Sequence, residues 1–301
     1  MAIAFCLIIL GFILSFVLTG FFRQFALRKE ILDLPNERSL HQQPTPRGGG
    51  IVFIAVFYAA LIFLWHTTFL PTDLLLALFG SVPIVIIGFL DDIYSIAVRW
   101  RLMTQGIAAI WSLYCLHLLN YSASPLLWVI TIWFTNLYNF MDGIDGLAAS
   151  EAVFIALTTG LLLFSHHAAL GLPLLALAAA VFGFLFWNWQ PAKVFMGDVG
   201  SGFLGFTFAI FMWATAEKGV LPVIFWWFLL SIFLVDTTFT LLFRIFQRKK
   251  WYAAHREHIY QKIAQSGFGH AHITLVVIVI DIVVLLPLTL IFLHFLHETA
   301  W

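Results

Sequence analysis

The chain has 301 residues, of which 62% are hydrophobic and only 10% are charged, and its formal net charge at pH 7 is zero. A soluble domain carries about 25% charged residues. The composition therefore excludes a soluble globular protein and indicates an integral membrane protein. The aromatic content of 17% is typical of lipid-facing surfaces and interfacial belts.

Long apolar runs predict an all-α, polytopic membrane protein. A transmembrane helix needs about 20 apolar residues, and such runs recur along the whole chain, which predicts about ten spans and a single transmembrane domain over residues 1–301. The first run lacks a basic n-region and a cleavage site, so we expect it to be retained. The helices are expected near residues 1–22, 50–66, 72–90, 104–119, 125–140, 147–165, 168–187, 199–216, 220–244 and 272–296.

The basic residues predict the orientation of these helices. Of the 15 lysines and arginines, all but Lys218 lie in or at the edge of four longer polar links, at 23–49, 91–103, 188–198 and 245–271. Because cytoplasmic loops carry an excess of Lys and Arg, we expect these links on the cytoplasmic face. Both chain termini are then expected on the outer face.

One polar stretch follows the fifth predicted helix. Asn136, Asn139, Asp142 and Asp145 recur at every third position, and on a helical or 3₁₀-like turn this spacing forms one polar strip. Glycines within the stretch allow the backbone to approach a ligand closely. Two carboxylates and two amides at the mouth of a span predict a divalent cation that carries a phosphate.

A second acidic motif ends the third predicted helix, where Asp91 and Asp92 are adjacent. Two neighbouring carboxylates are not both ionised without a cation or a basic partner nearby. A metal ion, a shared proton or a salt bridge to Arg99 or Arg101 would each explain the pair, and the pair alone does not select one of them.

Two further loops carry groups that can bind anions. Asp198 and Ser201 lie in a glycine-rich helix entrance, which offers a carboxylate, a hydroxyl and free backbone amides to a metal and a phosphate; an ordinary helix cap is the alternative. Arg47 precedes three glycines and is expected to contact an anion, although a plain loop is also consistent with this sequence.

The last polar link contains His255, Arg256 and His258, which supply donors for pyrophosphate or sugar oxygens. A zinc site is not expected because no third ligand lies nearby. Asp236, within the ninth predicted helix, is either a site residue or a polar group in helix packing. Asp281, in the tenth, has no evident partner in the sequence.

Taken together, the motifs resemble the polyprenyl-phosphate N-acetylhexosamine-1-phosphate transferases, glycosyltransferase family 4. The matching segments follow the family order and span about residues 35 to 262. They are Pro44-Thr-Pro-Arg-Gly-Gly-Gly50, Gly88-Phe-Leu-Asp-Asp92, Asn136-x-x-Asn-x-x-Asp-Gly-x-Asp-Gly-Leu147, Phe195-Met-Gly-Asp-x-Gly-Ser201 and the late histidine-containing loop.

The resemblance implies transfer of sugar-1-phosphate from a UDP-N-acetyl sugar to undecaprenyl phosphate, with release of UMP, in the bacterial inner membrane. It also implies Mg²⁺, or Mn²⁺, held by Asp198 and Asp142. Asp91, Asp92 and Asp145 are then the expected catalytic residues, either by direct attack of the lipid phosphate or through an aspartyl-phosphate at Asp91. The expected substrate-binding residues are Arg47, Asn136, Asn139, Ser201, His255, Arg256 and His258.

The late loop resembles one branch of this family more than another. The phospho-MurNAc-pentapeptide translocase branch has adjacent histidines there, whereas this chain reads Ala254-His-Arg-Glu-His-Ile-Tyr-Gln261. This is more similar to the O-antigen-initiating branch, and implies a role in lipopolysaccharide or related cell-envelope glycan synthesis. The sequence selects neither the sugar nor the oligomeric state, with a homodimer left open, and no nucleic acid partner is expected.

Two other functions are weighed against this one. A secondary transporter or lipid flippase usually carries its ionisable residues near the midplane of the membrane, whereas most acids here lie at one face; only Asp236 and Asp281 favour it. A CDP-alcohol phosphotransferase is disfavoured because its motif of spaced aspartates is absent.

Overall fold

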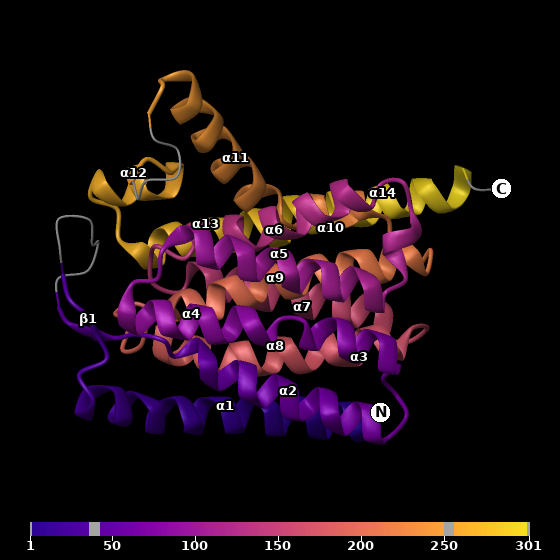
Figure 1. Ribbon diagram of the computed structural model, residues 1–301, viewed down its shortest axis with the longest axis horizontal. Coiled ribbons are helices and arrows are strands. Elements are labelled where there is room, and N and C mark those ends of the chain that lie inside the picture. Colours follow the sequence, from indigo (N-terminus) through magenta and orange to yellow (C-terminus); the bar gives the residue numbers. More distant parts are fainter. Residues whose placement is uncertain (1, 36–42, 250–255, 300–301) are drawn as a thin grey trace.

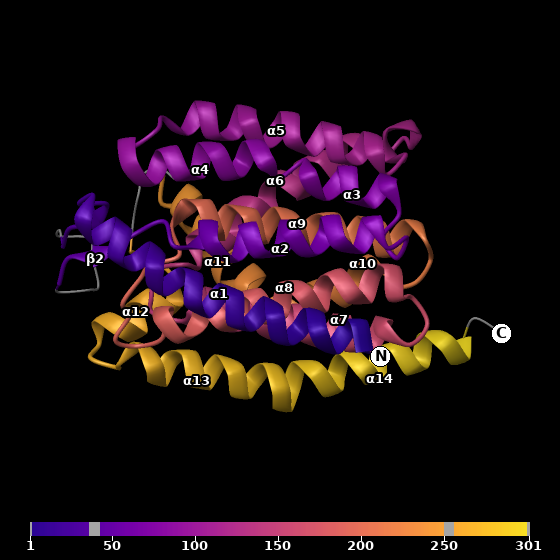
Figure 2. The ribbon, with the colours of Figure 1, turned by 90° about the horizontal axis from the view of Figure 1, so that it is seen from below.

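The computed structural model describes residues 2–35, 43–249 and 256–299. Most of these residues form helices that run nearly side by side, and both termini lie at one end of the bundle (Figures 1 and 2). The opposite end carries a two-stranded ladder, in which Leu32 pairs with Pro46, and the short helix α12. This arrangement agrees with the prediction that both termini lie on one face.

The helices and strands follow one another along the chain. They are α1 (Ala2–Arg28), β1 (Leu32–Asp33), β2 (Thr45–Pro46), α2 (Gly50–His66), α3 (Thr72–Phe79), α4 (Val82–Tyr94), α5 (Val98–Cys115), the 3₁₀ turn η1 (Leu118–Asn120), α6 (Ser124–Phe140), α7 (Leu147–Phe164), α8 (Ala168–Asn188), α9 (Gly197–Glu217), α10 (Val223–Leu229), α11 (Ser231–Phe246), α12 (Ile259–Gln265), α13 (His270–Ile280), the π-helix η2 (Asp281–Leu285) and α14 (Leu286–Thr299).

The protein is an all-α, multi-pass membrane protein. Among the described residues, six helical stretches are long and apolar enough to cross a membrane, and a bent pair of helices makes a seventh. Helices satisfy all their backbone hydrogen bonds internally, which is why they can cross a bilayer. The helix α2 is apolar but shorter than these six.

The polar link predicted at 91–103 is wrong. The helix α4 continues through both aspartates to Tyr94, where Ser95 adopts a left-handed conformation with φ of 55°. The next helix, α5, already begins at Val98, so Arg99 and Arg101 lie on a helix rather than in a loop. Charged residues at a helix end can reach water and still be helical. Hydropathy alone therefore ends α4 too early and begins α5 too late.

Three predicted helices are interrupted. The span at 72–90 divides into α3 and α4, and the span at 220–244 divides into α10 and α11, which meet at a bend of 82°. In consequence α11 leaves the bundle at a steep angle (Figure 1). The last span contains a π-helical turn that begins at Asp281; such turns are rare in helices and often occur at functional sites.

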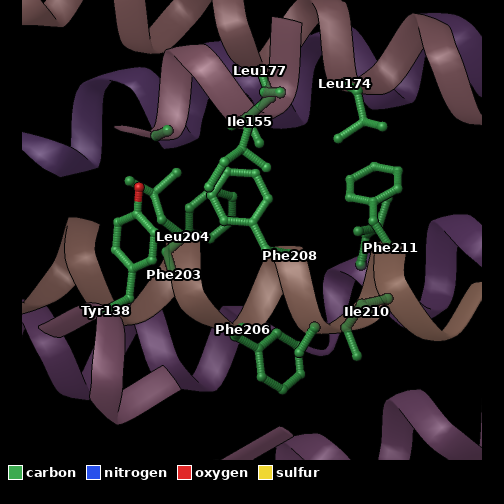
Figure 3. Close-up of a cluster of buried hydrophobic side chains, with 14 of the residues drawn as sticks. Tyr138, Ile155, Leu174, Leu177, Phe203, Leu204, Phe206, Phe208, Ile210 and Phe211 are labelled. Carbon is green, nitrogen blue, oxygen red and sulfur yellow. The ribbon is translucent and has the colours of Figure 1, made fainter. Parts of the chain in front are cut away.

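The helix α9 lies at the centre of the bundle. Its side chains are buried on every side, as expected for a helix that is apolar all round. Figure 3 shows Phe203, Leu204, Phe208 and Phe211 of this helix packed towards side chains of neighbouring helices. The first turn of α9 also touches α4: a Cβ on Gly88 would lie 2.8 Å from Val199 Cα. This close approach places the acidic end of α4 beside Asp198.

Candidate active site

The carboxylate of Asp92 is bound to the beginning of α9. The amides of Asp198 and Val199 donate to it, with distances of 2.9 Å to Oδ1 and 3.3 Å to Oδ2. The φ of +79° at Gly197 lets the chain turn into the helix there. Arg47 Nε lies 2.7 Å from Asp92 Oδ1, and the Asp92 side chain is 0% exposed. Asp92 therefore satisfies free amides at the helix start and fixes the position of Asp198.

The carboxylate of Asp198 collects partners from three other segments. Arg47 Nη2 lies 3.2 Å from its Oδ1, and Arg101 Nη1 lies 2.9 Å from its Oδ2. Asn139 Nδ2 donates to Oδ1 at 3.0 Å and to Ser201 Oγ at 2.9 Å. The Asp198 side chain is 20% exposed. Asp198 does not cap its own helix; it joins α5, α6 and the segment before α2 at one polar centre.

Of the alternatives left open for Asp91 and Asp92, salt bridges are present at both residues. Arg101 Nη1 binds Asp91 Oδ2, and Arg47 binds Asp92. Arg99 instead lies over the ring of Trp100, with its Cζ 5.6 Å from the ring centre. Arg101 was absent from the predicted site residues. Its position shortly after the two aspartates indicates a possible ion pair. The sequence does not show whether Arg99 or Arg101 faces the aspartates, because this depends on the rotation of α5 about its axis.

Asp142 completes the acidic part of this centre. It follows α6, and its pKa is raised well above its usual range by burial and by the nearby carboxylates of Asp198 and Asp92. Burial lowers the pKa of Arg47, but the charges of Asp92 and Asp198 outweigh that effect and raise it. Two guanidinium groups thus face four carboxyl groups, and a bound cation would favour the ionised form of Asp142.

The side-chain oxygens of this centre are potential ligands of a divalent cation. Within the described ranges, no group of three or more His, Cys, Asp or Glu side chains is arranged to hold a metal ion. Mg²⁺ does not require such a cage, because it is usually bound by one or two carboxylates, by water and by substrate phosphates. The oxygen donors of Asp198 and Asp142 therefore fit a magnesium ion that is shared with a phosphate substrate, and do not fit a closed structural site.

The polar strip predicted at 136–145 divides between three places. Asn139 and Asp142 belong to the centre around Asp198. Asn136 pairs with Gln105 through its amide, with an Nδ2–Oε1 distance of 2.7 Å. Asp145 accepts from the Ala192 amide at 3.1 Å and lies 3.4 Å from His270 Nδ1. Asn136 pairs with a side chain of the neighbouring helix α5, and Asp145 leaves the strip because helical geometry ends at Phe140. Gln105 and His270 carried no signal in the sequence.

The late loop is only partly within the described residues, and His255 lies outside them. The backbone carbonyl of Arg256 accepts from Gln265 Nε2 at 3.2 Å. The His258 side chain is 2% exposed, and its Nδ1 lies 3.1 Å from Asp236 Oδ1. The sequence left open whether Asp236 is a site residue or a polar group in helix packing. In the structure its carboxylate binds the late loop and holds it in place. A substrate contact by Arg256 or His258 stays a prediction.

An apolar groove of about 600 Å³ adjoins this end of the molecule. It lies between α11, α12 and α13 and reaches Met141 and Leu147, which flank the loop that carries Asp142. Most of its wall is aliphatic or aromatic, with Val235, Ile259, Ile263, Phe268, Val276 and Ile280 among the lining residues. A groove of this composition can hold a long hydrocarbon chain.

Comparison with known proteins agrees with these features. The model of glycosyl transferase family 4 matches residues 74–216. The chain is 31% identical to a probable undecaprenyl-phosphate N-acetylglucosaminyl 1-phosphate transferase of Bacillus subtilis, across 92% of this chain and 82% of that relative.

Two further relatives carry similar names. The chain is 32% identical to an undecaprenyl-phosphate alpha-N-acetylglucosaminyl 1-phosphate transferase of Yersinia pestis, across 82% of this chain and 73% of the relative. It is 28% identical to a decaprenyl-phosphate N-acetylglucosaminephosphotransferase of Mycobacterium tuberculosis, across 88% of this chain and 76% of the relative. With the motifs gathered around Asp198 and this extent of similarity, the chain belongs to glycosyl transferase family 4.

Proposed function

We propose that this protein transfers N-acetylhexosamine-1-phosphate from a UDP-sugar to undecaprenyl phosphate, and that the products are undecaprenyl-diphosphate-sugar and UMP. The observation that carries this proposal is the position of the polar centre beside the apolar groove. A phosphate could lie against Arg47 and Arg101 while an isoprenoid tail occupies the groove or the surrounding lipid. The names of the relatives include both a prenyl phosphate and a sugar phosphate, which supports this proposal.

The chemistry we propose is a direct displacement at phosphorus. An oxygen of the lipid phosphate forms a bond to the β-phosphorus of the UDP-sugar, and the bond from that phosphorus to the bridging oxygen breaks, so that UMP leaves with this oxygen. A phosphate monoester has a second pKa near 6, as in phosphorylated side chains. The attacking oxygen is therefore mostly deprotonated at neutral pH, and the reaction needs no dedicated base.

In this scheme the protein mainly positions charges. Arg47 and Arg101 offset negative charge that collects on the phosphates, and Asn139 holds Asp198 in place. Asp198 and Asp142 would hold Mg²⁺, which supplies further charge neutralisation at the diphosphate when bound. Asp92 orients the start of α9, because its side chain is fully buried and bound. Asp91 orients Arg101.

We further propose ten crossings of the bacterial inner membrane, in which α3 with α4, α10 with α11, and α13 with α14 each count as one. An even number of crossings places both termini on one side, and the distribution of basic residues favours the periplasm for the termini and the cytoplasm for the active site. Initiation of O-antigen or a related cell-envelope glycan is the role we favour for the product, with the UDP-sugar to be identified by assay.

The experiment is a measurement of UMP release by the purified protein with undecaprenyl phosphate and a panel of UDP-N-acetyl sugars, with and without Mg²⁺. We expect one donor to give UMP that depends on both the lipid and Mg²⁺. Folded protein that releases no UMP with any of these donors would overturn the proposal for this substrate class. Release without added lipid would indicate hydrolysis rather than transfer.

A further inference from the structure

Asp236 lies in α11, shortly after the bend, and its carboxylate binds the start of a different helix. The amide of Ile259 donates to its Oδ1 at 3.0 Å, and the amide of Tyr260 donates to its Oδ2 at 3.1 Å. His258 Nδ1 lies 3.1 Å from the same Oδ1. Both carboxylate oxygens are thus engaged by the first turn of α12, whose free amides they satisfy.

The helix α12 in turn contacts the loop that leaves α6. Tyr260 Oη donates to the carbonyl of Phe140 at 2.8 Å, and the Tyr260 ring is buried against Gly143, where a Cβ would lie 3.1 Å from Tyr260 Cζ. Phe140 directly follows Asn139, which binds Asp198, and lies two residues before Asp142. The place of α12 therefore fixes the geometry of the segment that carries two residues of the polar centre.

The same helix forms one wall of the apolar groove. Ile259, Tyr260 and Ile263 line the groove from α12, and Asp236 lines it from α11. A shift of α12 would change the groove and the polar centre together. Figure 1 shows that α11 projects out of the bundle and that α12 lies at the end of the molecule that carries β1.

We infer that Asp236 is a positioning residue for the transferase, which acts through α12 and Tyr260 on the loop at 140–143 and on the groove wall. The inference rests on the proposed function and adds a residue to it. An ordinary packing role would be served by bonds within α11, such as that from Thr240 Oγ1 to Asp236 Oδ1 at 3.1 Å. The bonds to α12 go beyond that role, because they join two separate elements.

The test combines a near-isosteric substitution of Asp236 with a substitution of Tyr260 on α12. Asp236→Asn keeps the size of the side chain but replaces one acceptor with an NH₂ group that cannot bind a backbone amide. Tyr260→Phe removes only the hydroxyl that reaches Phe140. Thr240→Val is the matched control, since it removes a bond to Asp236 that does not involve α12. Initial rates of UMP release and thermal unfolding are measured for each folded variant.

We expect Tyr260→Phe to lower kcat about tenfold, and Asp236→Asn about 30-fold with a rise in KM for undecaprenyl phosphate. The double variant should fall no further than Asp236→Asn, to within about threefold, because both changes interrupt one path. Thr240→Val should retain kcat and KM. Losses that multiply in the double variant, or an unchanged lipid KM in Asp236→Asn, would overturn the inference. The wild-type rate tests the proposed function separately.

Discussion

The guanidinium of Arg101, on α5, lies 2.9 Å from Asp198 Oδ2 while it also binds Asp91 on α4. One cation thus connects two acidic motifs that are more than 100 positions apart in the sequence. Arg101 binds Oδ2 of the Asp198 carboxylate, whereas Asn139 binds Oδ1. Loss of Arg101 would therefore disturb the end of α4 and the start of α9 together.

Arg101→Ala should lower kcat/KM for UMP formation by about 100-fold or more, because the phosphates lose a positioned positive charge, Asp91 loses its arginine and Asp198 loses one of its two. The measurement is the rate of UMP release at several donor concentrations. Arg99→Ala is the matched control: it removes a basic residue from the same helix that contacts Trp100 rather than an aspartate. Equal losses in both variants would show that the effect comes from net charge alone.

Asp198→Asn should reduce turnover by about 10²–10³-fold, as removal of a key electrostatic group does in other enzymes. The protein should still fold, since the amide retains the shape of the side chain, and Asp91 and Asp92 keep their arginines. Thermal unfolding gives a second readout. Mg²⁺ should raise the melting temperature of the wild type, and should do so less for the variant. A variant with full Mg²⁺-dependent activity would contradict the metal assignment.

The pair of Asn136 and Gln105 predicts a stability effect rather than a substrate effect. Their side-chain amides bond to each other, with an Nδ2–Oε1 distance of 2.7 Å, and Asn136 also donates to the carbonyl of Ile132. Asn136→Leu alone should cost about 1–3 kcal/mol of unfolding free energy, because Gln105 is left buried without its partner.

The double variant Asn136→Leu/Gln105→Met should be more stable than Asn136→Leu, since replacing both partners by apolar groups removes the unsatisfied amide. Chemical denaturation in detergent compares the variants. If instead Asn136→Leu is as stable as the wild type but shows a higher KM for the UDP-sugar, Asn136 would contact the substrate, as expected from the sequence.

A second stability prediction concerns Glu151 and Asp281, whose carboxyl groups lie close together between α7 and the π-helix. The two residues are 1% and 0% exposed, and within the described part of the chain neither carboxyl group has a hydrogen-bond partner other than the opposite carboxyl group. Two buried carboxylates without a donor are unfavourable. Glu151→Gln introduces an amide that can donate to Asp281, and should raise the unfolding free energy by about 1–3 kcal/mol.

Thermal unfolding of the Glu151→Gln variant tests this expectation, with Glu217→Gln as a control at the partly exposed end of α9. The control should leave the melting temperature unchanged. A lower melting temperature for Glu151→Gln would mean that the acidic pair is held by a cation or another group that requires both charges.

The sequence by itself determined the class of the protein and most of the centre. Hydropathy selects membrane helices because a bilayer excludes unsatisfied backbone groups, and the ordered motifs pointed to Arg47, Asn139, Asp142 and Asp198. These motifs could be read locally, since each places a charged group beside glycine or at a helix end, where no packing partner is needed to recognise it.

Only the tertiary structure decided how these groups are paired. Arg101 rather than Arg99 joins the centre because of the phase of α5. Asn136 pairs with Gln105 of α5, and Asp145 leaves the strip because helical geometry ends at Phe140. Asp236 and Asp281 could not be interpreted from sequence, since their neighbours come from α12 and α7. Close helix packing, such as that of Gly88 against Val199, sets these distances, and a linear pattern carries no information about which helices touch.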